Sequence, residues 1–167
     1  MSYSIMAIEA LIFALIFTTI IIAIYRGDKK YAPSSLFNYP EDIREEYFKT
    51  HERVNVSGSS KKVILTKSIA ILVFIAILAI MAYVAKARSF REGFWFGFLM
   101  MLWIGIYDTF FMDWVLFANL KMFRLEGTEH MDKAYHQKWF HLKGMLFPGT
   151  LFGVIVAVLV GALIALL

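Results

Sequence analysis

Two carboxylates stand inside one of the most apolar stretches of this chain. Asp108 and Asp113 belong to the sequence WIGIYDTFFMDW, residues 103–114, whose other members are mostly aromatic and aliphatic. A charge at the centre of a bilayer costs at least about 2.5–3.5 kcal/mol. Acids in such a stretch are therefore either structural partners of other polar groups or parts of a site for acid–base or coordination chemistry.

Histidine is the second residue type here that is suited to chemistry. Three of the four histidines, His130, His136 and His141, follow one another closely beside further carboxylates. Imidazole and carboxylate groups together suit a divalent metal ion or a general acid–base pair. Asp132 precedes His136 by four residues, so it is placed to orient that imidazole on a helix. The spacing between His136 and His141 departs from the H-E-x-x-H metal signature, and polar interfacial histidines are the alternative.

These residues define the candidate site. We predict Asp108, Asp113 and His136 as catalytic residues and His130, His136 and His141 as ligands of a possible divalent metal. The predicted pocket lining consists of Trp103, Tyr107, Trp114 and Lys67. In the structural alternative, Asp113 pairs with Lys67 and Asp108 bonds to a neighbour such as Tyr107. Positions five apart lie about 140° apart on an α-helix, so Asp108 and Asp113 should have different partners or face one cavity from two sides.

The elements that position this site are predicted to be transmembrane helices. The chain has 167 residues, of which 60% are hydrophobic and 17% are aromatic, more than a soluble domain of this size buries. A helix crosses the bilayer in about 20 residues. Four apolar runs have this length: 4–25, 63–85, 93–118 and 145–167. We predict one all-α domain, residues 1–167, that is a polytopic membrane protein with four spans.

The loop charges predict the topology. Basic residues are concentrated in loops 26–62 and 119–144, with fewer in the 86–92 loop. The positive-inside rule then places the two long loops in the cytosol and both termini outside, as expected of a multi-pass protein of the bacterial plasma membrane. The net charge of +4 is mostly topogenic. It favours anionic lipid head groups and indicates no nucleic-acid partner.

Both long loops contain a segment of helical periodicity. Over residues 40–53, a proline and two acids open a pattern of apolar residues at helical spacing. Over residues 128–142, Thr128 is placed to cap a helix with an apolar stripe of Met131, Tyr135, Trp139 and Leu142. We predict two short amphipathic cytosolic helices, the second of which lies along the membrane surface before the fourth span.

Small residues recur every four positions along the fourth span. They are Gly149, Gly153, Ala157, Gly161 and Ala165. Such a stripe lets another helix approach closely. Gly93, Gly97 and Gly105 form a partial stripe on the third span, so packing of the third span on the fourth is one prediction. A homo-oligomer through Gly149, Gly153, Ala157 and Gly161 is the other.

The acidic motif at 103–114, the segment GTEHMDKAYHQKWFHLKG and the glycine-rich last span resemble a family of small uncharacterised bacterial four-span membrane proteins. The resemblance covers about the last 75 residues and implies no activity. Three functions remain open. The protein binds or converts an amphiphilic or lipid-like molecule at a cytosol-facing acidic and histidine site; it transports a cation or metal as an oligomer; or it is a non-catalytic accessory subunit of a membrane complex.

Overall fold

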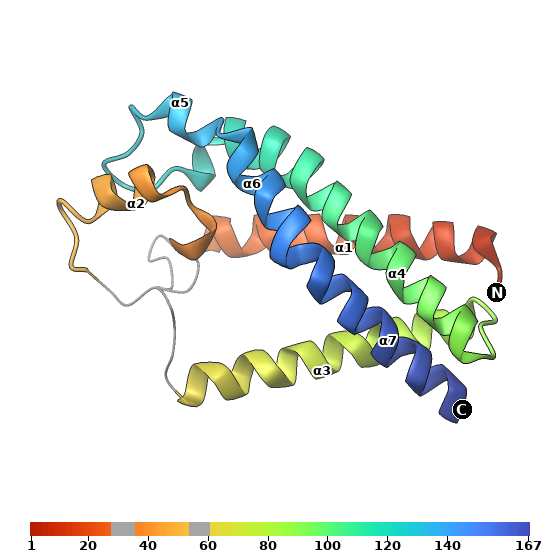
Figure 1. Ribbon diagram of the computed structural model, residues 1–167. Coiled ribbons are helices and arrows are strands. Elements are labelled where there is room, and N and C mark those ends of the chain that lie inside the picture. The colour runs from red at the N-terminus through yellow and green to blue at the C-terminus, as the bar shows by residue number, and fades with distance from the viewer. Residues whose placement is uncertain (28–35, 54–60) are drawn as a thin grey trace.

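The chain is built around long helices. A computed structural model describes residues 1–27, 36–53 and 61–167, and these residues form helices and no strand (Figure 1). The long helices are α1 (Tyr3–Gly27), α3 (Lys61–Val84), α4 (Phe90–Tyr107) with its π-helical extension η2 (Asp108–Phe117), and α7 (Thr150–Leu166). Within the described residues, four helical stretches are long and apolar enough to cross a membrane. The prediction of an all-α polytopic protein is confirmed.

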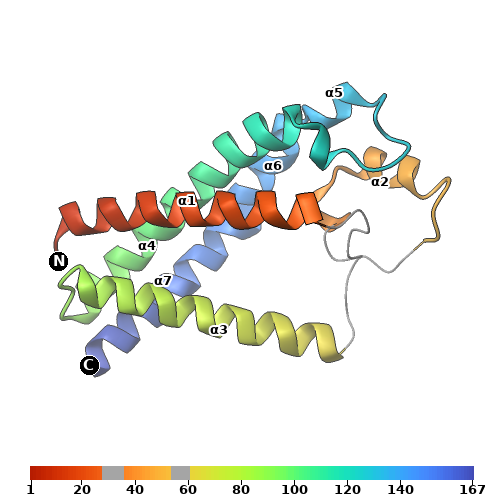
Figure 2. The same ribbon diagram turned by 180° about the vertical axis from the view of Figure 1, so that it is seen from behind.

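Both chain ends lie at the same end of the molecule as the turn between α3 and α4 (Figures 1 and 2). The Ser2 amide donates to the Ala85 carbonyl oxygen over 2.6 Å. The terminal ammonium of Met1 lies 2.7 Å from a carboxylate oxygen of Glu92. The Ser89 side chain caps α4 by accepting a hydrogen bond from the Glu92 amide. Glu92 therefore ties the amino terminus to the start of the third span.

The opposite end carries a small cap, formed by residues 36–53 and 118–137. It contains η1 (Leu36–Asn38), α2 (Glu41–Tyr47), η3 (Lys121–Phe123) and α5 (Asp132–Tyr135). Together with the end of η2 it buries Leu36, Tyr39, Ile43, Phe117, Phe123, Leu125, Ala134 and Tyr135 in one cluster. The cap therefore has a hydrophobic core of its own, into which the third span inserts Phe117. Residues 28–35 and 54–60 of the first long loop lie outside the described residues.

The amphipathic helices of the loops differ from the predicted ones in extent. The first ends at Tyr47, although helical spacing continued to residue 53. The second is interrupted after Tyr135, and a separate helix α6 (Lys138–Gly144) follows. Thr128 does not cap it: its hydroxyl donates to the Leu125 carbonyl oxygen and is hydrogen-bonded to the Tyr135 hydroxyl. The buried Tyr135 needs such a partner for its polar end, and this bond holds the loop in place.

Helix α6 leads directly into the fourth span. The chain passes from α6 through η4 (Met145–Gly149) into α7, with a kink where Phe147 has φ −151° and ψ 125°. Pro148 follows, and a proline inside a helix removes one backbone donor. Helix α6 also contacts η2. The predicted surface helix is therefore a bent continuation of the fourth span that packs against the third.

The glycine-rich face of α7 packs against α4. A Cβ atom at Gly97 would lie 3.0 Å from the Ala157 Cα atom, and one at Gly161 would lie 2.9 Å from the Phe90 carbonyl oxygen. Small residues permit this close approach of the two backbones. Gly153, Ala157 and Gly161 are buried within the chain, and the homo-oligomer through this stripe stays a prediction.

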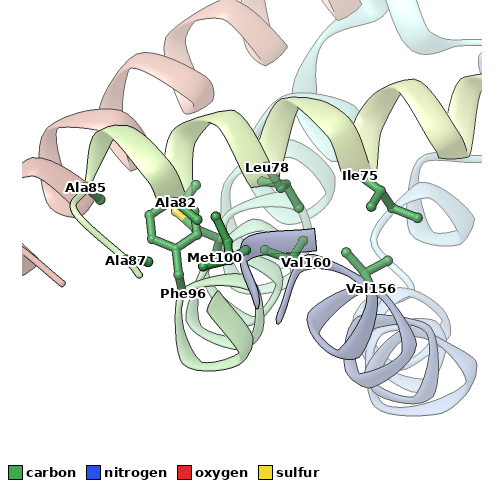
Figure 3. Close-up of a cluster of buried hydrophobic side chains, with 10 residues drawn as sticks. Ile75, Leu78, Ala82, Ala85, Ala87, Phe96, Met100, Val156 and Val160 are labelled. Carbon is green, nitrogen blue, oxygen red and sulfur yellow. The ribbon is translucent and has the colours of Figure 1, made fainter. Parts of the chain in front are cut away.

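A buried cluster joins α3 to this pair of helices. Figure 3 shows side chains of α3, α4 and α7 that meet near the end of the molecule where the termini lie. Leu78, Phe96, Val156 and Val160 are completely buried there. Helix α3 diverges from the other helices towards its own amino-terminal end (Figures 1 and 2).

Candidate functional site

An aspartate and a histidine from different spans form a pair beneath the cap. Asp113 belongs to η2 and His141 to α6. The His141 Nδ1 atom lies 2.9 Å from the Asp113 Oδ2 atom, and the two side chains are 8% and 22% exposed. Phe117 and Phe140 contact the imidazole with ring centroids 5.3 and 5.1 Å away. The imidazole therefore lies between one close carboxylate and two aromatic rings.

This pairing decides which imidazole nitrogen carries a proton. An ionised carboxylate has no proton to donate, so its position 2.9 Å from Nδ1 of His141 favours a proton on that nitrogen. In the neutral ring, Nε2 is then an acceptor. Nε2 is buried and has no hydrogen-bond partner among the described residues. A carboxylate behind a histidine with a free second nitrogen is an arrangement suited to proton transfer or to accepting a hydrogen bond.

Asp108 lies at the junction of α4 and η2, where the helix widens. It interacts electrostatically with both Asp113 and His141. Its carboxylate makes no hydrogen bond or ion pair with any residue in the described ranges. In a π-helix the hydrogen-bonded positions are five apart, which is the separation of the two acids. The wider turn brings both acids to one cavity, and only Asp113 has a partner.

The cavity lies between α1, the third span, α6 and the kink that precedes α7. Its volume is about 1110 Å³. Asp108, Thr109, Asp113 and His141 supply polar atoms deep in the wall, and most of the remaining lining from the spans is apolar. The apolar lining includes Phe17, Ile21, Phe98, Met101, Leu102 and Phe147. Phe147 is 72% exposed, so the apolar wall continues onto the outer surface of the helices.

Glycines help to keep this cavity open. Gly105, Gly144, Gly149 and Gly153 all line it. A Cβ atom at Gly144 would meet no other atom within 4 Å. A larger side chain at this position has space to occupy without displacing protein atoms, which makes it a probe of the cavity.

The predicted aromatic lining lies elsewhere. Trp103 donates from Nε1 to the Ala10 carbonyl oxygen over 3.3 Å, and the Tyr107 hydroxyl lies 2.7 Å from the Thr18 hydroxyl. These contacts fasten the third span to α1. The Trp114 ring lies beneath the Lys138 ammonium, 5.0 Å from its centroid. None of these three aromatic residues lines the cavity, because Trp103 and Tyr107 face α1 and Trp114 lies beside Lys138.

Lys67 does not pair with Asp113. It is exposed on the part of α3 that diverges from the other helices, and the described residues offer it no ion pair. The partner of Asp113 is His141. The sequence placed both Lys67 and Asp113 about a turn from the same membrane surface, but equal depth does not bring two helices into contact.

The histidines do not form a cluster. His136 is exposed on the cap, where its Nδ1 atom lies 2.8 Å from the Asp132 carbonyl oxygen and 3.8 Å from an Asp132 carboxylate oxygen. His130 is also exposed. The described residues contain no group of three or more His, Asp or Glu side chains that is able to hold a metal ion. The interruption after Tyr135 separates His136 from His141, so His141 alone reaches the cavity.

The cap supplies cavity residues that were not predicted. Arg44 and Gln137 line the cavity from this end. Gln137 donates from Nε2 to the Asp42 carboxylate over 2.7 Å, which links α6 to α2. The Nε atom of Arg44 is buried, and its guanidinium has no hydrogen bond or ion pair with any described residue. In the sequence, Arg44 is one of many loop cations, and nothing in its spacing distinguishes it.

Comparisons with known proteins do not assign this chain. No family model, curated protein or solved structure matches it. The chemistry of the site therefore rests on its own geometry: a large cavity, a histidine beside an aspartate, and a carboxylate and an arginine that have no ion pair with the described residues.

Proposed function

We propose that this protein binds an amphiphilic, lipid-like molecule in the cavity beneath the cap. The observation that carries the proposal is the cavity itself, which combines a broad apolar wall with the convergent polar groups of Asp108, Asp113 and His141. Ligand pockets of about 300–1,000 Å³ accept drug-sized molecules and combine apolar walls with a few placed polar groups. At about 1110 Å³ this cavity slightly exceeds that range and has space for part of a lipid.

The lining suggests how such a molecule lies. Its chain packs against Phe98, Met101 and Phe147, and the exposed Phe147 continues this surface towards the bilayer. A hydroxyl or ammonium group of the ligand donates to Asp108, which has no partner among the described residues. The Asp113–His141 pair presents the Nε2 atom of His141 as a hydrogen-bond acceptor nearby. The same pair supplies an acid–base group for conversion of the ligand.

Occupancy of the cavity is tested by filling it. We expect wild-type protein purified in a neutral detergent to retain an amphiphile, and a Gly144→Leu variant to retain roughly tenfold less, because the leucine side chain takes ligand volume. The measurement is native mass spectrometry of the protein, followed by extraction and identification of the bound molecule. Ala7→Leu is the matched control, since Ala7 is exposed on α1 outside the cavity. Equal retention in both variants would contradict the proposal.

We also propose that the cap faces the cytosol of a bacterial cell and both termini face outward. The concentration of basic residues in the two cap loops supports this orientation. The chain contains no cysteine, so thiol labelling reports only on the position of the introduced cysteine. We expect Ser2→Cys to react with an impermeant thiol reagent in intact cells, and Glu126→Cys, whose position is 86% exposed on the cap, to react only after lysis. The reverse labelling pattern would invert the topology.

A further inference from the structure

We infer that the cavity recognises an anionic amphiphile, with Arg44 as the anchor for a phosphate group of its head. This inference rests on the proposed binding function and names the ligand class. A buried polar atom is normally hydrogen-bonded. Arg44 lines the cavity, its Nε atom is buried, and its guanidinium has no ion pair or hydrogen bond with any residue of the described ranges. An anion supplied by the ligand gives this guanidinium the partner that the described residues do not provide.

The surroundings of Arg44 favour an anion at this end of the cavity. Lys143 also lines the cavity and is exposed, and the Gln137 amide is held there by its bond to Asp42. Four carboxylates of α2 (Glu41, Asp42, Glu45 and Glu46) are close to Arg44 in sequence, but none of them pairs with it. A planar guanidinium binds two oxygens of a phosphate at once, and a lysine adds a second, less directional positive charge.

Arg44 belongs to the cap, whereas the acids of the cavity belong to the third span. Asp113 and Asp108 precede Phe117, the end of that span, by four and nine residues. At helical rise these separations are on the order of 6 and 14 Å. The inference therefore places the phosphate at the cap end of the cavity and a hydroxyl or ammonium group of the ligand at Asp108.

The cavity mouth has the composition of a membrane interface. Trp139 and Phe37 line the cavity and are 69% and 65% exposed. Tryptophan and lysine side chains are typical of the head-group level of a bilayer. A lipid with its head group under the cap and its chains along Phe147 uses both the charged and the apolar parts of the lining.

The test compares lipids that differ in charge. Protein in a neutral detergent is incubated with phosphatidylglycerol or with phosphatidylcholine of the same chains, and retained lipid is measured by native mass spectrometry. We expect wild type to retain more phosphatidylglycerol than phosphatidylcholine. We expect Arg44→Gln to retain about tenfold less phosphatidylglycerol than wild type, corresponding to about 1.4 kcal/mol. Its retention of phosphatidylcholine should equal that of wild type. Arg53→Gln is the control, because Arg53 is an exposed cap arginine paired with Glu45. Arg44→Lys, which keeps the charge, should restore most of the binding.

Further arms separate the sources of the anion. Oleate tests a carboxylate on an amphiphile, and weaker retention than phosphatidylglycerol supports phosphate as the preferred group. Displacement of the lipid by millimolar inorganic phosphate would overturn the inference of an amphiphile in favour of a soluble anion. Equal loss in Arg44→Gln and Arg53→Gln, or no loss in either, would overturn the role of Arg44. If the two arginine variants do not differ but Gly144→Leu abolishes retention of both lipids, the proposed binding function stands and only the anion site fails.

Discussion

A His141→Leu variant is expected to lose about 3 kcal/mol of unfolding free energy. Breaking a buried pair by removing one partner typically costs about 3–5 kcal/mol, because the remaining charge is left uncompensated. The lower end applies here, because the Asp113 side chain is 22% exposed and water partly solvates its charge. Leucine also keeps the contacts with Phe117 and Phe140. The measurement is a denaturant titration of the purified protein in mixed micelles.

A double-mutant cycle separates the pair from simple loss of packing. We expect the Asp113→Leu/His141→Leu double variant to be more stable than the sum of the single changes predicts, with a coupling energy of about 0.5–3 kcal/mol. Lys67→Met provides the matched control. Because Lys67 is exposed and pairs with no described acid, its combination with Asp113→Leu should be additive to within about 0.3–0.5 kcal/mol. Coupling to Lys67 but not to His141 would contradict the described geometry.

The largest effect on folding is expected from Gly161→Leu. Even a methyl group at this position would lie 2.9 Å from the Phe90 carbonyl oxygen and 3.1 Å from the Phe94 nitrogen, both of them backbone atoms. Overpacking of a close-packed interior costs about 1–3 kcal/mol for small additions. A leucine must separate α4 from α7, so we expect most of the protein to be lost from the monodisperse peak in size-exclusion chromatography.

Two variants distinguish this steric effect from a general intolerance of the fourth span. Ala165→Leu adds a similar volume to an exposed position of the same helix, and should leave the elution profile unchanged. Gly144→Ala replaces a glycine where an added Cβ atom meets nothing within 4 Å, and should also be tolerated. A Gly161→Leu variant that elutes and melts like wild type would show that α7 does not pack against α4 through this face.

Several features of the fold follow from the sequence because they depend on local composition. Apolar length predicted the four spans to within a few residues at most boundaries. The small residues of the third and fourth spans predicted that these two spans pack together. In the structure Gly97 packs against Ala157. The prediction was less accurate for the second amphipathic helix. There the buried Tyr135 hydroxyl is hydrogen-bonded to Thr128, and the helix is interrupted after Tyr135.

The sequence predicts the depth and chemical type of the polar groups: acids within the third span, and histidines and cations in the loops at one end. It does not predict which of these groups meet, because that depends on the tertiary structure. The π-helical turn after Tyr107 brings Asp108 and Asp113 to one cavity, and the break between α5 and α6 leaves His141 rather than His136 at this cavity. The cap then places Arg44 at the cavity. Such meetings depend on helix bends and on contacts between distant segments, because residue spacing specifies position along a helix but not which neighbouring helix lies opposite.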